Sequence, residues 1–253
     1  MNILEVSHVW KSYKTKKDTT DVLRDINLCV GENERVAVMG PSGSGKTTLL
    51  NLISGIDRAD GGEIIIDGKN TSDMKKSEIA LFRRKKLGMV FQDYNLLECL
   101  NVRENILIPM ALEKIYSDEQ EARLEHVAKV LCISDILNKR IPDISGGQKQ
   151  RAAIARAIIN TPAVIIADEP TGNLDSKSAK DVMEYLMEAN EKFGTSILMV
   201  THDPFAASYC QRVILLKDGA IISELARNGS RQQFFHDIHK MLVMIGGGDQ
   251  NDI

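Results

Sequence analysis

A glycine-rich loop at residues 40–48, "GPSGSGKTT", limits the fold of this chain more than any other stretch of the sequence. It matches the pattern G-x-x-x-x-G-K-[ST], and it follows the apolar run "RVAVM" and precedes the helix-like start "TLLNLI". A strand, a glycine turn and a helix in this order surround a phosphate with backbone N–H groups and the positive end of a helix. The stretch therefore predicts an α/β core that binds a nucleotide.

The loop residues have separate expected roles. Lys46 would neutralise the β- and γ-phosphates, and the Thr47 hydroxyl would be a ligand of Mg²⁺. An ordinary glycine-serine turn with an incidental lysine is the alternative, and the filled motif in its strand–helix context argues against it. The loop residues expected to contact the nucleotide are Gly40, Ser42, Gly43, Gly45, Lys46, Thr47 and Thr48.

Two adjacent acidic residues, Asp168 and Glu169, stand at the end of a second apolar run, "AVIIAD", which begins at residue 163 and ends with Asp168. Asp168 stands at the carboxyl end of this predicted strand, where α/β sheets bind ligands, so it is expected to hold the metal through its water shell. Glu169 would act as a general base or orient the attacking water. Paired acids at a strand end are also common helix caps, a reading that the upstream phosphate loop makes less attractive.

Composition excludes several classes of protein. The chain has 253 residues, enough for one large or two small domains, and a net charge of -3 with acids and bases interspersed, which argues against nucleic acid as a partner. Its four cysteines are scattered without a C-x-x-C pair, so we expect reduced thiols rather than a zinc site or disulfides. Without a signal peptide or a run of about 18 apolar residues, we expect a cytosolic chain that reaches a membrane through a partner.

Hydrophobic patterning predicts the elements of the core. Residues 163–201 read as a strand, a helix and a strand, and "KDGA" at residues 217–220 reads as a hairpin turn. Residues 101–160 show helical periodicity without a convincing strand. There, a capping box starts at Ser117, and Leu124, Val127, Ala128 and Leu131 share one face. A helix is expected from residue 230, before a disordered end "GGGDQNDI". The expected strands begin near residues 3, 35, 63, 87, 163, 195 and 212.

A second glycine-rich segment, "ISGGQKQR" at residues 144–151, resembles the signature of ATP-binding cassette (ABC) proteins, with Ile144 in place of the usual leucine. Other elements of that family stand in matching order over residues 3–225. They are an aromatic residue at Tyr13, Gln92 in "VFQD", Asp175 in "GNLD" and His202 in "VTHD".

The resemblance implies a P-loop NTPase of the α/β class. Its RecA-like core would carry N-terminal antiparallel strands and an inserted α-helical subdomain at about residues 93–160. The ATPase domain would span residues 1–227, and residues 228–253 would form a C-terminal helix and flexible tail.

The same resemblance explains the two glycine-rich loops. In the family, two cassettes pack head to tail as a homodimer, and each ATP lies between the phosphate loop of one chain and the signature of the other. Ser145, Gly146, Gly147 and Gln148 would thus bind the γ-phosphate side of ATP held by a twin chain. Without the resemblance, "SGGQ" could be an ordinary glycine turn that caps a helix.

The remaining family positions carry further expected roles. His202 would contact the γ-phosphate and steady the water, and Gln92 would reach Mg²⁺ or water, although a surface amide is the alternative for Gln92. Tyr13 would stack on adenine, in competition with Trp10 or with a role in the core. Asp175 is expected in the nucleotide site. Glu169, His202, Lys46 and Gln92 would be catalytic, and Thr47, Gln92 and Asp168 would hold the metal.

Cassettes of this family without transmembrane segments serve a separate integral membrane permease at the cytoplasmic face of the membrane. The segment "DYNLLECLNVREN" after Gln92 would line the groove in which the permease docks. Leu96 and Leu97 could equally belong to the core. A charged residue in place of Leu97 or Leu100 is expected to abolish recruitment to the membrane.

Within the lipoprotein-release and macrolide-export group, the chain resembles the cassettes of bacitracin-resistance type transporters, through the motifs "QDYNLL", "ISGGQKQR", "VTHDPFAASYC" and "RQQFFHDI". These often signal to a sensor kinase. The alternative is an ATPase of a membrane-associated signalling or lipoprotein-release complex that moves no substrate across the bilayer.

Overall fold

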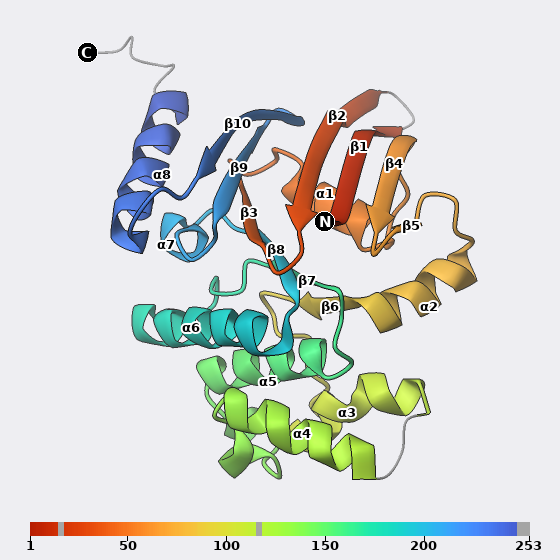
Figure 1. Ribbon diagram of the computed structural model, residues 1–253, viewed down its shortest axis with the longest axis vertical. Coiled ribbons are helices and arrows are strands. Elements are labelled where there is room, and N and C mark those ends of the chain that lie inside the picture. The colour runs from red at the N-terminus through yellow and green to blue at the C-terminus, as the bar shows by residue number, and fades with distance from the viewer. Residues whose placement is uncertain (15–17, 115–117, 247–253) are drawn as a thin grey trace.

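The computed structural model describes residues 1–14, 18–114 and 118–246, and within them the chain forms two sheets and the helices that cover them (Figure 1). Six strands make the larger sheet, in the order β10-β9-β3-β8-β7-β6. Their bounds are β3 Arg35–Met39, β6 Leu87–Val90, β7 Val164–Asp168, β8 Ser196–Val200, β9 Arg212–Lys217 and β10 Ala220–Ala226.

Most of this sheet is parallel, because β3, β6, β7, β8 and β9 pair in parallel and β10 is added by an antiparallel hairpin. The unit β7–α6–β8, with α6 at Ser176–Phe193, is the predicted strand–helix–strand. Alternate residues of β3 enter different hydrophobic clusters: Ala37 and Met39 pack in one, Val36 and Val38 in the other. The sheet is therefore covered on both faces, which is why its strands are apolar throughout.

The smaller sheet is antiparallel and has the order β2-β1-β4-β5. Its strands are β1 Asn2–Lys14, β2 Thr19–Gly31, β4 Gly61–Ile66 and β5 Lys69–Asn70. Helix α1, Lys46–Ile53, lies beneath it, and Leu49, Leu50 and Ile53 share a core with β1, β2 and β4.

Strand β2 corrects the sequence interpretation, which placed no strand at residues 19–31. The buried side chains Leu23, Ile26, Leu28 and Val30 do not alternate strictly, because the register shifts by one residue around Asp25, where φ is +50°. A bulge of this kind breaks the period of two by which a strand is recognised.

Helices dominate the middle of the chain, as expected. Leu124, Val127, Ala128 and Leu131 are buried together, whereas the proposed cap Ser117 lies outside the described residues. In Figure 1 the group forms the lower part of the molecule, far from the antiparallel sheet. The helices of this region are α3 Val102–Leu112, α4 Asp118–Val130, the short η1 Ser134–Ile136 and η2 Ile141–Asp143, and α5 Gly146–Ile158; α2, Lys76–Lys86, precedes them.

The chain ends in the predicted helix, α8 at Arg231–Gly246, which packs beside the short helix α7, Pro204–Ala207. Phe234 and Ile238 of α8 are buried in the main core, and the Arg231 guanidinium lies 4.4 Å from the ring centroid of Tyr209. The stretch expected to be disordered lies, from residue 247 on, outside the described residues. Among the helices of the described part, none has the length and apolarity needed to cross a bilayer.

Candidate nucleotide-binding site

A cavity of about 650 Å³ lies where β3, β7 and β8 end, between the phosphate loop and the two acids. Eleven of the residues predicted from the sequence line it together, although they come from four separate stretches of the chain. They are Gly40, Ser42, Gly43, Gly45, Lys46, Thr47, Thr48, Gln92, Asp168, Glu169 and His202.

Two positions of the phosphate loop, Gly40 and Gly45, have no room for a side chain. A Cβ added at Gly40 would lie 2.0 Å from the carbonyl oxygen of Leu216. Gly45 has φ +104°, and its Cβ would lie 2.7 Å from Cδ2 of Leu23. The loop is therefore clamped between the two sheets, with β9 on one side and β2 on the other.

Lys46 begins α1, and its ammonium donates to two carbonyl oxygens of the loop, those of Gly40 at 2.9 Å and Pro41 at 2.8 Å. Burial lowers the pKa of Lys46, and the negative charges of Glu169 and Asp168 oppose that shift. The buried hydroxyl of Ser44 has no hydrogen-bond partner among the described residues. A partly buried cation and an unpaired hydroxyl in a clamped glycine loop fit a polyphosphate.

Asp168 is the last residue of β7. Burial raises the pKa of its carboxyl, the neighbouring charge of Glu169 raises it further, and Lys46 acts in the opposite direction. Asp168 shares the cavity with the Thr47 hydroxyl and the Gln92 amide, and oxygen atoms of this kind are the ligands that Mg²⁺ prefers. The donor set therefore fits that ion.

Glu169 adopts a left-handed conformation with φ +46°, and its backbone N–H donates to Val200 O at 2.8 Å. Its carboxylate accepts hydrogen bonds from the Thr201 hydroxyl at 2.9 Å and from the backbone N–H of His202 at 3.0 Å. His202 Nδ1 lies 2.7 Å from the same carboxylate oxygen, Glu169 Oε1. The acid and the histidine thus form one unit at the adjacent ends of β7 and β8.

Gln92 follows β6, and its amide N–H donates to Oδ1 of Asn173 at 3.1 Å. The Asn173 amide donates in return to Gln92 O at 3.2 Å and to Asp93 at 2.9 Å. These bonds join the segment after β6 to the segment after β7. Because Asn173 takes a side-chain N–H of Gln92, the side-chain oxygen of Gln92 stays available to accept a hydrogen bond or to bind a cation in the cavity.

Two predicted residues lie outside the lining of the cavity. The Tyr13 hydroxyl donates to Oδ2 of Asp57 at 2.7 Å, and the Tyr13 ring lies 5.1 Å from the ammonium of Lys11. Asp175 caps α6, where its carboxylate accepts from the backbone N–H groups of Lys177 and Ser178.

The signature loop also lies outside this cavity. Ser145 caps α5 and forms a capping box with Gln148: the Ser145 N–H donates to the Gln148 side chain at 2.9 Å, and the Gln148 N–H donates to the Ser145 hydroxyl at 3.3 Å. A Cβ at Gly146 would lie 3.1 Å from the hydroxyl of Tyr94. One chain therefore preforms both loops but does not bring them together.

The sequence interpretation did not include three other wall residues, Val22, Pro41 and Val200. Val22 belongs to β2, the strand that the bulge concealed, and its carbonyl oxygen would lie 2.9 Å from a Cβ at Gly45. The run of apolar residues at positions 22, 23, 26, 28 and 30, read with one inserted residue, is the signal that could have revealed it.

Comparison with known proteins is consistent with this geometry. The ABC transporter family matches residues 23–172. The chain is 52% identical to the ABC transporter ATP-binding protein YxdL of Bacillus subtilis, over 100% of this chain and 97% of the relative. It is 51% identical to the bacitracin export ATP-binding protein BceA of Halalkalibacterium halodurans, over 100% of both chains.

A solved structure gives the same result. It is a dimeric, post-hydrolysis state of the ATP-binding cassette MJ0796 bound to ADP and Pi, with a TM-score of 0.80, 38% identity, and coverage of 90% of this chain and 100% of that chain. The sequence, the cavity and these matches agree on an α/β cassette that binds ATP. The chain belongs to the ABC transporter family and is one of its ATP-hydrolysing, ATP-binding proteins.

Proposed function

We propose that this chain is the ATPase subunit of a bacterial ABC transporter that drives a separate membrane permease in resistance to, or sensing of, peptide antibiotics. The observation that carries the ATPase part is the single cavity in which the phosphate loop, both acids, Gln92 and His202 meet. The 51% identity over the full length to a bacitracin export ATP-binding protein supports the antibiotic part.

In the proposed reaction, Lys46 and the loop N–H groups bind the phosphates, and Glu169 takes a proton from the attacking water. His202 and Thr201 orient the Glu169 carboxylate through the hydrogen bonds described above. Thr47, Gln92 and Asp168 would hold a magnesium ion, which when bound neutralises phosphate charge. Tyr13 would offer its half-exposed ring to adenine, while Asp175 would act by fixing the start of α6.

We further propose that the working unit is a homodimer around two ATP molecules. The signature residues Ser145, Gly146 and Gly147 do not line their own chain's cavity, and a relative of known structure is dimeric. The N-terminus of α5 would approach the γ-phosphate held by the other copy. ATP would then favour the closed dimer and hydrolysis would release it, because the contact depends on the γ-phosphate.

For the permease we propose a groove of about 420 Å³ between α2, α3 and α5. Asn160 lines it with a buried amide that has no partner among the described residues, so a docked backbone could pair with it. Arg156 lines it too and donates to the carbonyl oxygens of Tyr94 and Asn95. The groove lining is Ala80, Arg83, Arg84, Leu87, Gly88, Met89, Phe91, Asn95, Ile108, Pro109, Leu112, Arg156, Ala157 and Asn160.

This lining revises the expected docking residues. Of the segment at residues 93–105, only Asn95 lines the groove, and Leu97 and Leu100 lie outside it. Leu96 packs against the main core, whereas Leu97 is 50% exposed. Leu112, at the end of α3 and 55% exposed, is the better target for disrupting permease binding. Binding there would place the chain at the cytoplasmic face of the membrane, in reach of a sensor kinase through the permease.

The test compares Leu112→Asp with Leu81→Asp. Leu81 is a similarly exposed leucine of α2, at 51%, outside the groove lining. We expect Leu112→Asp to abolish co-purification with a polytopic membrane protein from native membranes, and Leu81→Asp to retain it, with ATP binding unchanged in both. Cross-linking and mass spectrometry identify the partner. Unchanged co-purification of Leu112→Asp would reject this groove, and recovery of ribosomes or DNA instead of a permease would reject the transporter assignment.

A further inference from the structure

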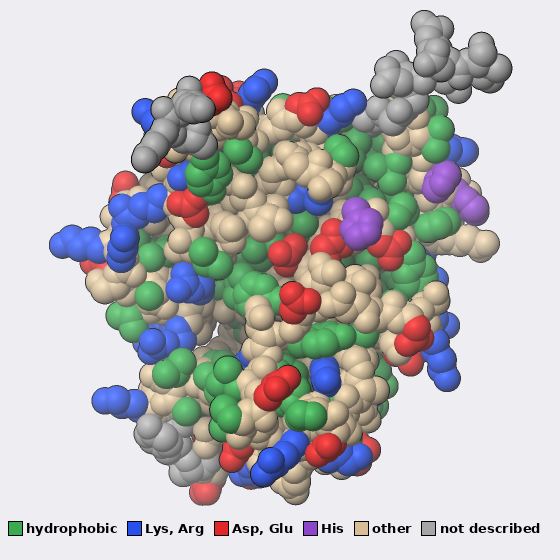
Figure 2. Space-filling model, turned by 180° about the vertical axis from the view of Figure 1, so that it is seen from behind, with side chains coloured by type: hydrophobic (Ala, Val, Ile, Leu, Met, Phe, Trp, Pro, Cys, Tyr) green, Lys and Arg blue, Asp and Glu red, His purple; other side chains and the backbone are tan. Residues whose placement is uncertain are grey.

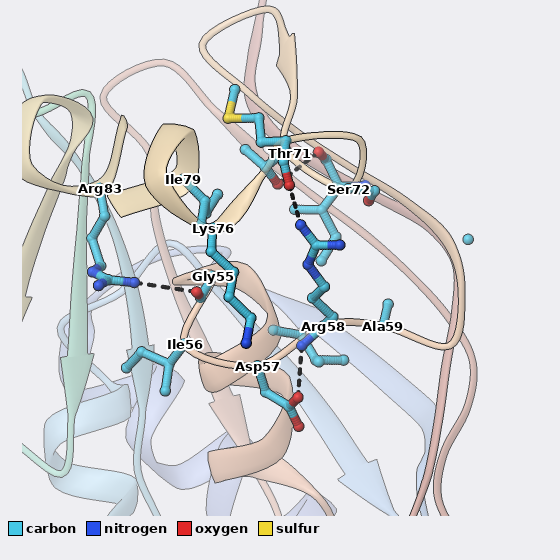
Figure 3. A pocket seen from close by; sticks show the side chains of 14 residues that line it. Gly55, Ile56, Asp57, Arg58, Ala59, Thr71, Ser72, Lys76, Ile79 and Arg83 are labelled. Carbon is cyan, nitrogen blue, oxygen red and sulfur yellow. Dashed lines mark hydrogen bonds between the residues drawn. The ribbon is translucent and has the colours of Figure 1, made fainter. Parts of the chain in front are cut away.

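A second pocket, of about 600 Å³, lies apart from the nucleotide cavity, between the end of α1, strand β4 and helix α2 (Figure 3). None of the residues that line it lines the nucleotide cavity or carries a role in the proposed reaction. A pocket of this volume is large enough to enclose a small organic ligand.

Three cations, Arg58, Lys76 and Arg83, line this pocket against one carboxylate, Asp57. In Figure 3 the side chain of Lys76 extends across the pocket toward the side formed by Ile56 and Asp57. Among the described residues, no carboxylate lies within ion-pair distance of any of the three cations.

The protein groups that these cations do contact are neutral. Arg58 donates to the carbonyl oxygen of Met74, and Arg83 donates to those of Ser54 and Gly55 at 3.3 and 3.2 Å. Asp57 is already engaged, by the Tyr13 hydroxyl, the Lys11 ammonium and the backbone N–H of Arg58. The pocket therefore carries positive charge that the protein itself does not neutralise. Figure 2 shows basic side chains gathered along the left edge of the molecule, the side on which α2 lies.

Apolar and polar side chains share the rest of the wall. Leu52, Ile64 and Ile79 are buried in the core below it, and Ile56, 55% exposed, stands at its rim. Thr71 and Ser72 are tied to the backbone of Ile64, by the Thr71 hydroxyl at 3.0 Å and the Ser72 hydroxyl at 3.1 Å. Apolar side chains beside a few converging charged groups are found in sites for small molecules.

We propose that this pocket binds a small molecule that carries both a phosphate group and an apolar portion. Arg58 and Lys76 would bind the phosphate by charge-assisted hydrogen bonds, and the isoleucine wall would receive the apolar part. The same chemistry is offered by a soluble phosphate ester and by the head group of a phospholipid.

Asp57 lines the pocket and also accepts a hydrogen bond from Tyr13, so a ligand in the pocket could influence the nucleotide site. The backbone N–H of Arg58 donates to Asp57 at 2.7 Å, its carbonyl oxygen accepts from Lys11 at 2.7 Å, and Asp57 in turn accepts from Tyr13. A ligand that binds Arg58 would move Arg58, and with it Asp57 and Tyr13. The affinity for ATP would then change, a consequence that rests on the proposed role of Tyr13 at adenine.

The experiment uses isothermal titration calorimetry on the full chain with AMP-PNP and Mg²⁺ at saturation, so that the phosphate loop is occupied. The probe is 1-naphthyl phosphate. We expect one binding site, with affinity at least about tenfold above that for 1-naphthol, which lacks the phosphate, and for glycerol 1-phosphate, which lacks the apolar ring. Equal binding of 1-naphthol, or no binding of the probe, would overturn the proposal.

Variants then locate the site. Lys76→Gln and Arg58→Gln should each weaken probe binding by about tenfold or more, whereas Lys75→Gln, which removes the neighbouring charge outside the pocket, should change it less than about twofold. Equal losses in all three variants would mean a general effect of positive charge and would reject the site. These readouts involve neither hydrolysis nor a permease, so their failure is distinct from a failure of the proposed transport function.

Two further measurements complete the test. The protein is sedimented with phosphatidylglycerol vesicles and, for comparison, with phosphatidylcholine vesicles. Binding to the phosphatidylglycerol vesicles that is lost in Lys76→Gln assigns the ligand to a lipid. Binding of the probe without binding to vesicles assigns it to a soluble ester. The affinity for ATP should change by about fivefold when the probe is bound, and by less in Lys76→Gln. An ATP affinity that ignores the probe would overturn the route through Asp57.

Discussion

The Nδ1 atom of His202 lies 2.7 Å from Oε1 of Glu169, and the backbone N–H of His202 donates to the same oxygen at 3.0 Å. The two residues are 33 positions apart in the sequence and meet because β7 and β8 are parallel neighbours. The carboxylate of Glu169 is thus held by His202, which lies two residues beyond the end of β8. Any motion of the end of β8 relative to β7 changes the orientation of the proposed base.

Glu169→Gln tests that base. The amide retains an oxygen for the His202 N–H but cannot accept a proton from water, so kcat should fall by about 10²-fold or more while ATP binding remains. With ATP, the variant should elute as a stable dimer in size-exclusion chromatography. Hydrolysis at the wild-type rate would remove Glu169 from its role.

Lys46→Ala is the contrasting variant, because it should act on binding. Loss of the ammonium that lies against the loop carbonyls removes a charge-assisted contact to phosphate, and the affinity for ATP should fall by about tenfold or more. Fluorescence titration with a labelled ATP measures this. An unaltered affinity would contradict the phosphate site.

Ser145→Trp tests the need for a second copy. The bulky ring would block the start of α5 from approaching another chain's ATP, so turnover should be lost although a single chain still binds ATP. Loss of the cap on α5 is expected to cost about 1 kcal/mol of stability, which Ser145→Asn, a residue that can still cap, should avoid. ATPase rates, titrations and thermal melts separate the two effects. Full activity of Ser145→Trp as a monomer would refute the dimer.

Asp168→Asn tests the electrostatics of the site through pH. Burial and Glu169 raise the pKa of Asp168 above its ordinary value of 3.8, so in the folded apo protein the ionised form is disfavoured and destabilises the fold at neutral pH. The variant should therefore melt about 2 °C or more above wild type at pH 7.5, and this gap should shrink as pH falls through the raised pKa toward 3.8. With Mg²⁺ and ATP the order should reverse, because wild type gains more from the ligand. A variant less stable than wild type without ligand would contradict this account.

The thiols should differ in reactivity. Burial raises the pKa of Cys210 to about 12, which leaves a thiolate fraction of about one in ten thousand at pH 8, whereas Cys99 and Cys132 are exposed. Iodoacetamide on the native protein, read by mass spectrometry, should label Cys99 and Cys132 and spare Cys210 until the chain is unfolded. Rapid labelling of Cys210 in the native state would show that its environment opens.

Much of this architecture follows from local sequence. The phosphate loop, the strand that ends in Asp168 and the helix capped by Ser145 each depend on residues close together in the chain, so their patterns are visible there. What the sequence could not predict depends on distant partners. The bulge at Asp25 concealed β2 because β1 determines where the register shifts, and the bonds between Gln92 and Asn173 join residues 81 positions apart.

Docking was harder to predict for a related reason. The sequence favours the apolar residues Leu97 and Leu100 for docking, which stays a prediction, whereas the groove proposed above is lined by residues of α2, β6, α3 and α5 from separate stretches of the chain. The charged pocket beside β4 has the same origin. Arg58 and Lys76 are unremarkable surface cations in the sequence, and only the fold gathers them around one hollow.

The separation of the signature from the phosphate loop of its own chain has a kinetic consequence for the proposed homodimer. In that dimer a single copy would bind ATP without hydrolysing it, so the specific activity in dilute solution would rise with enzyme concentration and level off once every copy is paired. Hydrolysis without transport would thus be limited by dilution, and a permease that binds two copies would raise turnover by bringing them together.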